Sequence, residues 1–197
     1  GTSNVALGTD ALKDNTTASN NTAVGDSALE SNTTGDQNTA LGGSALSSNT
    51  DGIRNTGIGY LAFRDNTSGE NNTAVGRSAM LSNTTGNYNS AVGSGALDSN
   101  TSGSNNVSLG YQALQSNTTA SNNVSIGYQS MYANTTGFDN VAVGRNSSDA
   151  ITTGAQNTSL GGNSLTTLTT GNNNTAVGFN GLFNATGSWN TAIGKDS

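Results

Sequence analysis

Hydrophobic residues recur at two places in a unit of 17 residues. A pentad of the form Asn-x-small-aliphatic-Gly begins at Asn4 and returns every 17 residues as far as Asn174, and a twelfth copy begins at Asn190. With the pentad Asn as position one, position four is always Val, Leu or Ile, and position nine is usually large and apolar, as in Leu29 and Met80. A fixed short period is the sequence signature of stacked structural repeats.

The unit is better suited to strands than to helices. A helix needs apolar residues at i, i+3, i+4 and i+7, whereas this unit has two apolar spots separated by Gly, and it is rich in the poor helix formers Asn, Thr and Gly. We predict two short strands per unit, at positions two to four and eight to ten. The chain is then an all-β parallel β-solenoid, or β-roll, of about twelve coils. Residues 1–197 form one domain of 11 units and a partial one, about 55 Å long at ~4.8 Å per coil.

Position three of the pentad is limited to Ala, Ser or Gly, while position four is always aliphatic. Neighbouring strand residues point to opposite sides, so both sides of this strand are expected to be covered. We expect the aliphatic side chain to fill the core and the small one to lie against another copy of the chain. The predicted oligomer interface is Ala23, Ala40, Ala74 and Ala91. The alternative is a flattened coil that packs its own two strands unevenly.

The invariant Asn and Gly residues are expected to stack in columns. Identical Asn side chains can hydrogen-bond along a parallel stack, and Gly supplies positive φ or close backbone approach at corners. The predicted structural ladder includes Asn21, Asn38, Asn72, Asn106, Gly25, Gly42, Gly76 and Gly110.

Charged residues avoid most of the unit. All eighteen fall at positions six, seven, ten, eleven, fourteen, sixteen or seventeen. An unpaired buried charge is very costly, so the charge-free positions are expected to be buried or stacked.

The overall composition excludes several functions. The net charge of −6 disfavours nucleic acid as a partner, and no apolar run is long enough for a membrane helix. Without His or Cys, the usual catalytic triads and zinc sites cannot be built, and the scattered acids form no recurring pair. We therefore expect no enzymatic activity, no cofactor and no metal. The absence of Cys fits an extracellular or virion protein, and the start at Gly1 suggests a processed product or a fragment.

Four aromatic residues directly follow an invariant Gly, at position six. They are Tyr60, Tyr111, Tyr128 and Phe179. Rings on a polar surface can bind the faces of sugars. The alternative is a small aromatic ladder that stabilises the stack.

The pentads Asn21-Thr22-Ala23-Val24-Gly25 and Asn123-Val124-Ser125-Ile126-Gly127 resemble the head repeat of YadA-like trimeric autotransporter adhesins. Similar repeats occur in phage tail fibres. The resemblance covers essentially the whole chain, although the adhesin repeat is shorter than 17 residues. It implies a homotrimeric, extracellular, non-enzymatic attachment fibre on a cell surface or virion, with a cell-surface glycan or protein as receptor.

Two other functions remain open. Pairs of Thr such as Thr33-Thr34 and Thr84-Thr85 could form an ice-binding face, although adjacent residues point to opposite sides of a strand. The chain could also be a self-assembling extracellular filament without a receptor.

Overall fold

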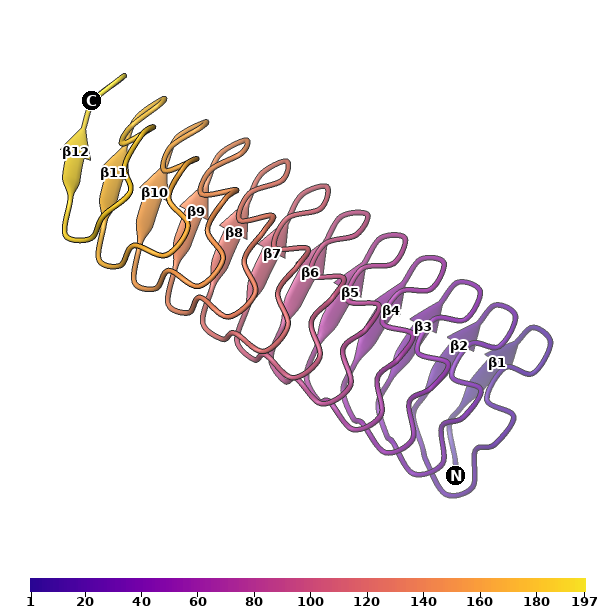
Figure 1. The fold of residues 1–197 in the computed structure, drawn as a ribbon. Coiled ribbons are helices and arrows are strands. Elements are labelled where there is room, and N and C mark those ends of the chain that lie inside the picture. Colours follow the sequence, from indigo (N-terminus) through magenta and orange to yellow (C-terminus); the bar gives the residue numbers. More distant parts are fainter.

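The computed structural model describes residues 1–197 and contains strands as its only regular elements. Each pentad supplies one three-residue strand, and the twelve strands form one parallel sheet in sequence order (Figure 1). The strands are β1 Val5–Leu7, β2 Thr22–Val24, β3 Thr39–Leu41, β4 Thr56–Ile58, β5 Thr73–Val75, β6 Ser90–Val92, β7 Val107–Leu109, β8 Val124–Ile126, β9 Val141–Val143, β10 Thr158–Leu160, β11 Thr175–Val177 and β12 Thr191–Ile193.

The predicted parallel β-solenoid is confirmed, with about eleven turns of about 17 residues each. Equivalent residues stack in register, so that Ala23 pairs with Ala40 and Gly57 pairs with Ala74. Coils are numbered here by their pentad Asn, from coil one at Asn4 to coil twelve at Asn190.

The prediction of a second strand at positions eight to ten is wrong. These residues form turns, and the residues at positions seven and nine have positive φ, as in Ser27 (54°) and Leu29 (51°). The left-handed conformation turns the chain twice in quick succession, so that the large side chain at position nine points inward and is fully buried. Each coil is therefore one short strand followed by hydrogen-bonded turns.

The small residues at position three face the interior of their own chain. Ala23, Ala40, Ala74 and Ala91 are all 0% exposed, so the prediction that they form an oligomer interface is wrong. The reason is visible at Gly57, where an added Cβ would lie 3.2 Å from Cγ of Leu46, the position-nine residue of the preceding coil. The interior is too narrow for a larger side chain opposite the position-nine residue.

The aliphatic side chains at position four also point in the opposite direction to the one predicted, which was toward the core. They point outward, and Leu41 (47%) and Leu109 (46%) are exposed. The core instead consists of positions three, eight and nine, with buried Asn at positions one and twelve. One chain closes this core by itself.

The Asn ladder is present as a continuous chain of hydrogen bonds. The backbone N–H of Asn38 donates to Oδ1 of Asn21 (2.8 Å), and the N–H of Asn89 donates to Oδ1 of Asn72 (2.8 Å). Asn106 is bonded to Asn89 in the same way at 2.9 Å. A second ladder at position twelve joins side chains directly, as from Asn49 Nδ2 to Oδ1 of Asn32 (2.7 Å). The pentad ladder satisfies buried polar groups from Asn4 to Asn190, whereas the position-twelve ladder ends at Asn134, whose Oδ1 is buried without a partner.

The pentad glycines stack so closely that no side chain fits. Gly76 has φ 134°, and an added Cβ would lie 2.6 Å from the carbonyl oxygen of Gly93 in the next coil. Gly25, Gly42 and Gly110 have the same conformation, with φ of 136°, 134° and 138°.

The apolar core changes composition in the C-terminal third. Position twelve becomes Ile151 and Leu168, which are fully buried and form a separate apolar cluster with Leu165 and Ala176. Between this cluster and the long core of the preceding coils lies a layer of buried Ser residues. Their hydroxyl groups bond one another, as between Ser148 and Ser159 (2.7 Å) and between Ser147 and Ser164 (3.0 Å).

Candidate binding surface

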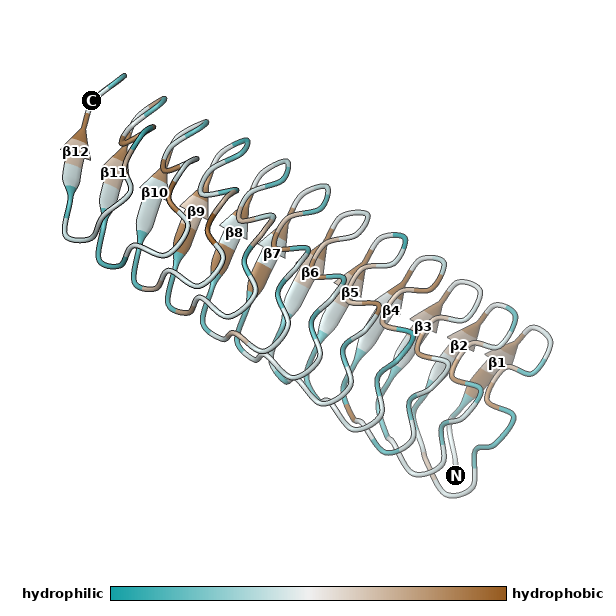
Figure 2. Ribbon diagram, in the orientation of Figure 1, coloured by the Kyte–Doolittle hydropathy of each residue, from teal (hydrophilic) through white to brown (hydrophobic).

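The most extensive surface feature is the outward side of the sheet, here called the outer face. It consists of the residues at positions two and four of β1 to β12, which are all partly or well exposed. Position two contributes Thr, Ser or Val, and position four contributes only Val, Leu or Ile. Figure 2 shows the apolar position-four residues as brown segments at the arrowheads of the strands. The outer face therefore combines an aliphatic column with a parallel column of Thr, Ser and Val.

The outer face carries no charged residue at any of its positions, although it faces away from the core of the chain. The expectation that charge-free positions are buried or stacked holds for positions one, three, eight, nine and twelve in most coils. At positions two and four the same exclusion of charge acts on an exposed surface. Burial within this chain does not account for it.

Two further exposed columns run along the edges of the outer face. The leading column is the residue directly before each pentad Asn, and includes Arg54 and Asp139. The trailing column is the residue directly after each pentad Gly. It includes Arg77 and Arg145, together with the four predicted aromatic residues. Charged and aromatic side chains are thus placed beside the outer face rather than on it.

The four aromatic residues are exposed, at 60% for Tyr60, 48% for Tyr111, 49% for Tyr128 and 45% for Phe179. Tyr111 and Tyr128 stack with ring centroids 5.5 Å apart and an angle of 16° between the ring planes. The two rings cover each other's facing surfaces, which is the arrangement expected of an aromatic ladder that stabilises the stack.

Tyr60 and Phe179 each lie beside a Gly of the preceding coil. An added Cβ on Gly43 would be 3.4 Å from the ring of Tyr60, and one on Gly162 would be 3.4 Å from the ring of Phe179. The two rings therefore occupy equivalent places, three coils from Tyr111 and Tyr128 respectively.

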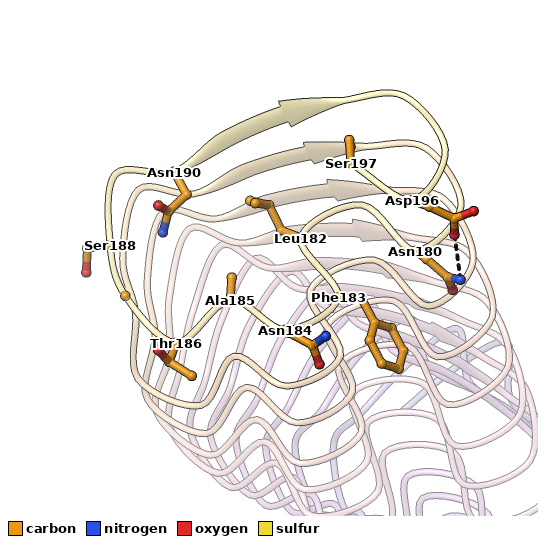
Figure 3. Close-up of a pocket in the computed structure, with 11 residues that line it drawn as sticks. Asn180, Leu182, Phe183, Asn184, Ala185, Thr186, Ser188, Asn190, Asp196 and Ser197 are labelled. Atoms are coloured by element: carbon orange, nitrogen blue, oxygen red, sulfur yellow. Dashed lines mark hydrogen bonds between the residues drawn. The ribbon is translucent and has the colours of Figure 1, made fainter.

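A hollow of about 650 Å³ lies at the C-terminal end of the rod. Figure 3 shows Leu182 and Ala185 directed into it, with the Asn180 Nδ2 to Asp196 Oδ1 hydrogen bond (2.9 Å) at its edge. It is the interior of the last full turn, seen where no further coil lies on top. Asp196 is the one titratable residue that lines it, so it offers no pair of groups for acid–base chemistry.

Two acidic residues at position ten are unusual in their burial. Partial burial raises the pKa of the Asp98 and Asp149 carboxyl groups, and one oxygen of each is buried without a hydrogen-bond partner. Four ion pairs lie on the surface, one of them between Lys13 and Glu30 of adjacent coils (3.4 Å). No three His, Cys, Asp or Glu residues come together as potential metal ligands. No helix suited to crossing a membrane is present.

Comparison with protein-family models, with curated proteins and with solved structures finds no match in any of the three.

Proposed function

We propose that the chain is a non-enzymatic, extracellular fibre segment, structural and adhesive, of a cell surface or a viral tail fibre. The observation that carries this proposal is the charge-free outer face, which runs along the whole rod and is not covered by the chain itself. Long exposed apolar surfaces rimmed by polar residues are typical of protein interaction sites. The in-register pairing of the strands keeps equivalent residues of this surface in columns along the rod.

The proposed partner of the outer face is a further copy of the chain. The resemblance to trimeric adhesin heads implies three chains about a common axis, with the outer face turned toward that axis. This replaces the interface first expected at Ala23, Ala40, Ala74 and Ala91, which are enclosed in the core. Val24, Leu41, Val75 and Val92, one position later, are the residues proposed to meet the partner chain.

The adhesive role is proposed for the trailing column, where Tyr60, Tyr111, Tyr128 and Phe179 are exposed. Aromatic rings contribute large contact areas and suit both glycan and protein receptors. Because Tyr111 and Tyr128 stack on each other, Tyr60 and Phe179 are the rings with no aromatic neighbour in their column.

Light scattering and native mass spectrometry test the assembly, and binding of the labelled protein to glycan arrays and cells tests adhesion. We expect a defined homo-oligomer whose binding falls when Tyr60 and Phe179 are replaced by Ala. A stable monomer would contradict the self-association, and unchanged binding of that variant would contradict the adhesive role of the trailing column.

Ice binding is a second candidate, supported now by a different set of residues. At position thirteen the Thr hydroxyls are used within the stack, as from Thr33 Oγ1 to the carbonyl of Thr50 (3.0 Å). The outer face instead offers Thr22, Thr39, Thr56 and Thr73 in register beside an aliphatic column. A thermal-hysteresis assay tests ice binding, and the absence of thermal hysteresis would contradict it.

A further inference from the structure

The outer face and its two edge columns together show a symmetry that suggests how a second copy docks. We propose that two copies pair through their outer faces in antiparallel orientation, with coil one of each chain opposite coil twelve of the other. This inference rests on the proposed self-association and specifies its partner, orientation and register.

The area is sufficient for a stable pair. From the leading to the trailing column a coil spans seven residues, roughly 20 Å at ~3.3 Å per residue, and the twelve coils are about 55 Å long. The two columns and the outer face thus cover roughly 1,100 Å² per copy. A standard specific interface buries about 800 Å² per partner.

A second copy can cover the outer face over its whole width. Around a threefold axis, each face meets its two partners mainly along its edges, whereas in a pair the whole face is buried. Aligned sheets pack about 10 Å apart, with side chains of their facing sides interdigitating. The larger area buried in a pair is the reason for proposing two chains rather than the three that the resemblance implies.

The orientation follows from the two columns of the outer face. In an antiparallel pair related by a twofold axis along the strands, position four lies on position four and position two on position two. The aliphatic residues of one chain, such as Leu41 and Leu160, then form a continuous dry seam with those of the other. In a parallel pair the aliphatic column would instead lie on the Thr, Ser and Val column.

The register follows from the leading column. When coil one faces coil twelve, coil four faces coil nine. Arg54, directly before coil four, then faces Asp139 of the second copy, directly before coil nine. By symmetry this pair forms twice. Neutral residues also match across the axis, as Gln37 does with Gln156 and Asn71 with Asn122.

The trailing column supports the same register. Tyr60 in coil four faces Arg145 in coil nine of the second copy, and Arg77 in coil five faces Tyr128 in coil eight. The pair therefore uses Tyr60 between the two copies and leaves the adhesive role proposed for this column to Phe179, in coil eleven. Arg placed against a Tyr ring is a favourable cation–π combination. A shift by one coil in one direction would instead oppose Arg77 with Arg145, and like charges at an interface are unfavourable. A shift in the other direction would place Arg54 opposite Asn122 and lose the pair with Asp139. The pairs that involve Arg all lie in the central six coils, where the two faces stay closest if the sheets twist.

Single-cysteine variants test the pairing, because the chain has no Cys of its own. Leu41→Cys lies in coil three and Leu160→Cys in coil ten, both at exposed position-four sites. Mixed and treated with a short bis-maleimide crosslinker, the two variants are expected to form a covalently linked dimer, because facing residues of two sheets about 10 Å apart are too distant for a direct disulfide. Each variant alone is expected to remain uncrosslinked, because its two Cys residues lie seven coils, roughly 34 Å, apart. The control mixture is Asp51→Cys with Thr170→Cys, in the same two coils but outside the outer face and its edge columns.

Charge reversal tests the register. Arg54→Asp places an Asp opposite Asp139 at both symmetric positions and is expected to weaken the pair about tenfold, measured by sedimentation equilibrium. The double variant Arg54→Asp/Asp139→Arg is expected to restore the affinity. Asp51→Arg is the matched control for a change of charge on an exposed bend.

The outcomes separate the inference from the proposed function. Crosslinking of Leu41→Cys alone, or of Leu41→Cys with Thr39→Cys rather than with Leu160→Cys, would show a parallel assembly, overturning the antiparallel pair while leaving self-association intact. A wild-type chain that stays monomeric at every concentration would overturn both. Failure of the double variant to restore affinity would overturn the register.

Discussion

Asn21 and Asn32 donate hydrogen bonds to one shared acceptor, the carbonyl oxygen of Gly35, at 2.9 and 3.0 Å. One Asn begins the coil and the other precedes its last turn, so the shared carbonyl ties the two sides of the coil together. Each side chain also bonds an Asn of a neighbouring coil. A single residue type thus closes each coil and joins it to the next.

Replacing an Asn inside this network should be costly. In Asn72→Ala, the buried N–H of Asn89 loses its acceptor, and the carbonyl of Gly86 keeps only the bond from Asn83. We expect a loss of about 2–4 kcal/mol in the free energy of unfolding, because buried groups without partners pay their full desolvation cost. Urea denaturation followed by circular dichroism measures it. Thr73→Ala, on the outer face, is the control, and equal effects of the two variants would contradict the role of the ladder.

Enlarging position three should destabilise the single chain. Ala74 is 0% exposed, and the interior at this position is closed by the large residues at position nine. We expect Ala74→Leu to cost about 1–3 kcal/mol through overpacking. The side chain of Val75 points outward, so Val75→Leu should change the free energy of unfolding by less than about 0.5 kcal/mol. Thermal unfolding over a wide range of protein concentration separates this effect from assembly, since the loss in Ala74→Leu should not depend on concentration.

The buried Ser layer should divide the rod into two cooperative units. Ser147, Ser148, Ser159 and Ser164 lie between two apolar clusters, the smaller of which contains four fully buried residues. The shorter C-terminal part buries less apolar surface, so its amides should exchange faster than those of coils two to eight. Native-state hydrogen exchange with fragment mass spectrometry measures this. Uniform protection across coils two to eleven would contradict a boundary at the Ser layer.

The buried carboxyl of Asp149 should give a pH dependence of definite sign. Burial raises its pKa, so the folded chain holds the proton more tightly than the unfolded chain does. Its contribution to stability is fully present below about pH 4, where both states are protonated, and is lost as the pH rises through the folded pKa. Asp149→Asn should therefore stabilise the protein near pH 7 and leave it unchanged near pH 3.5.

The size of this effect is expected to stay below about 1 kcal/mol, because the carboxyl is only partly buried and solvent screens it. Denaturation midpoints of the wild type and the variant from pH 3.5 to 7.5 measure it. The exposed Asp51→Asn is the matched control for the loss of one acid. A variant that is less stable than the wild type near pH 7 would contradict the assignment.

The sequence predicted the period, the strand and the Asn and Gly columns, because these depend on residue identity at fixed spacing. It misjudged the interior in two places. Leu29 and Phe63 have positive φ, which large residues rarely adopt, so the turn at positions seven to nine looked like a second strand. Alternation along Thr73–Val75 shows which residues share a side, but it does not show which side is inside.

The small size of Ala74 was a true sign of close packing, but the neighbour is the same chain and not a second one. The absence of charge at positions two and four was visible in the sequence as well. Its meaning required the structure, because a charge-free position suggests an interaction surface only once it is known to face outward.

The in-register stacking of equivalent residues makes the rod a molecular ruler that can change length in whole steps. Each coil presents to the next the same strand edge, the same Asn side-chain acceptor and the same closely stacked Gly. Duplicating or deleting one 17-residue segment in a gene would therefore lengthen or shorten the rod by one step of about 4.8 Å without disturbing its neighbours. A paired rod constrains such events further, since a change in one half shifts every cross-chain match and calls for a compensating change in the other.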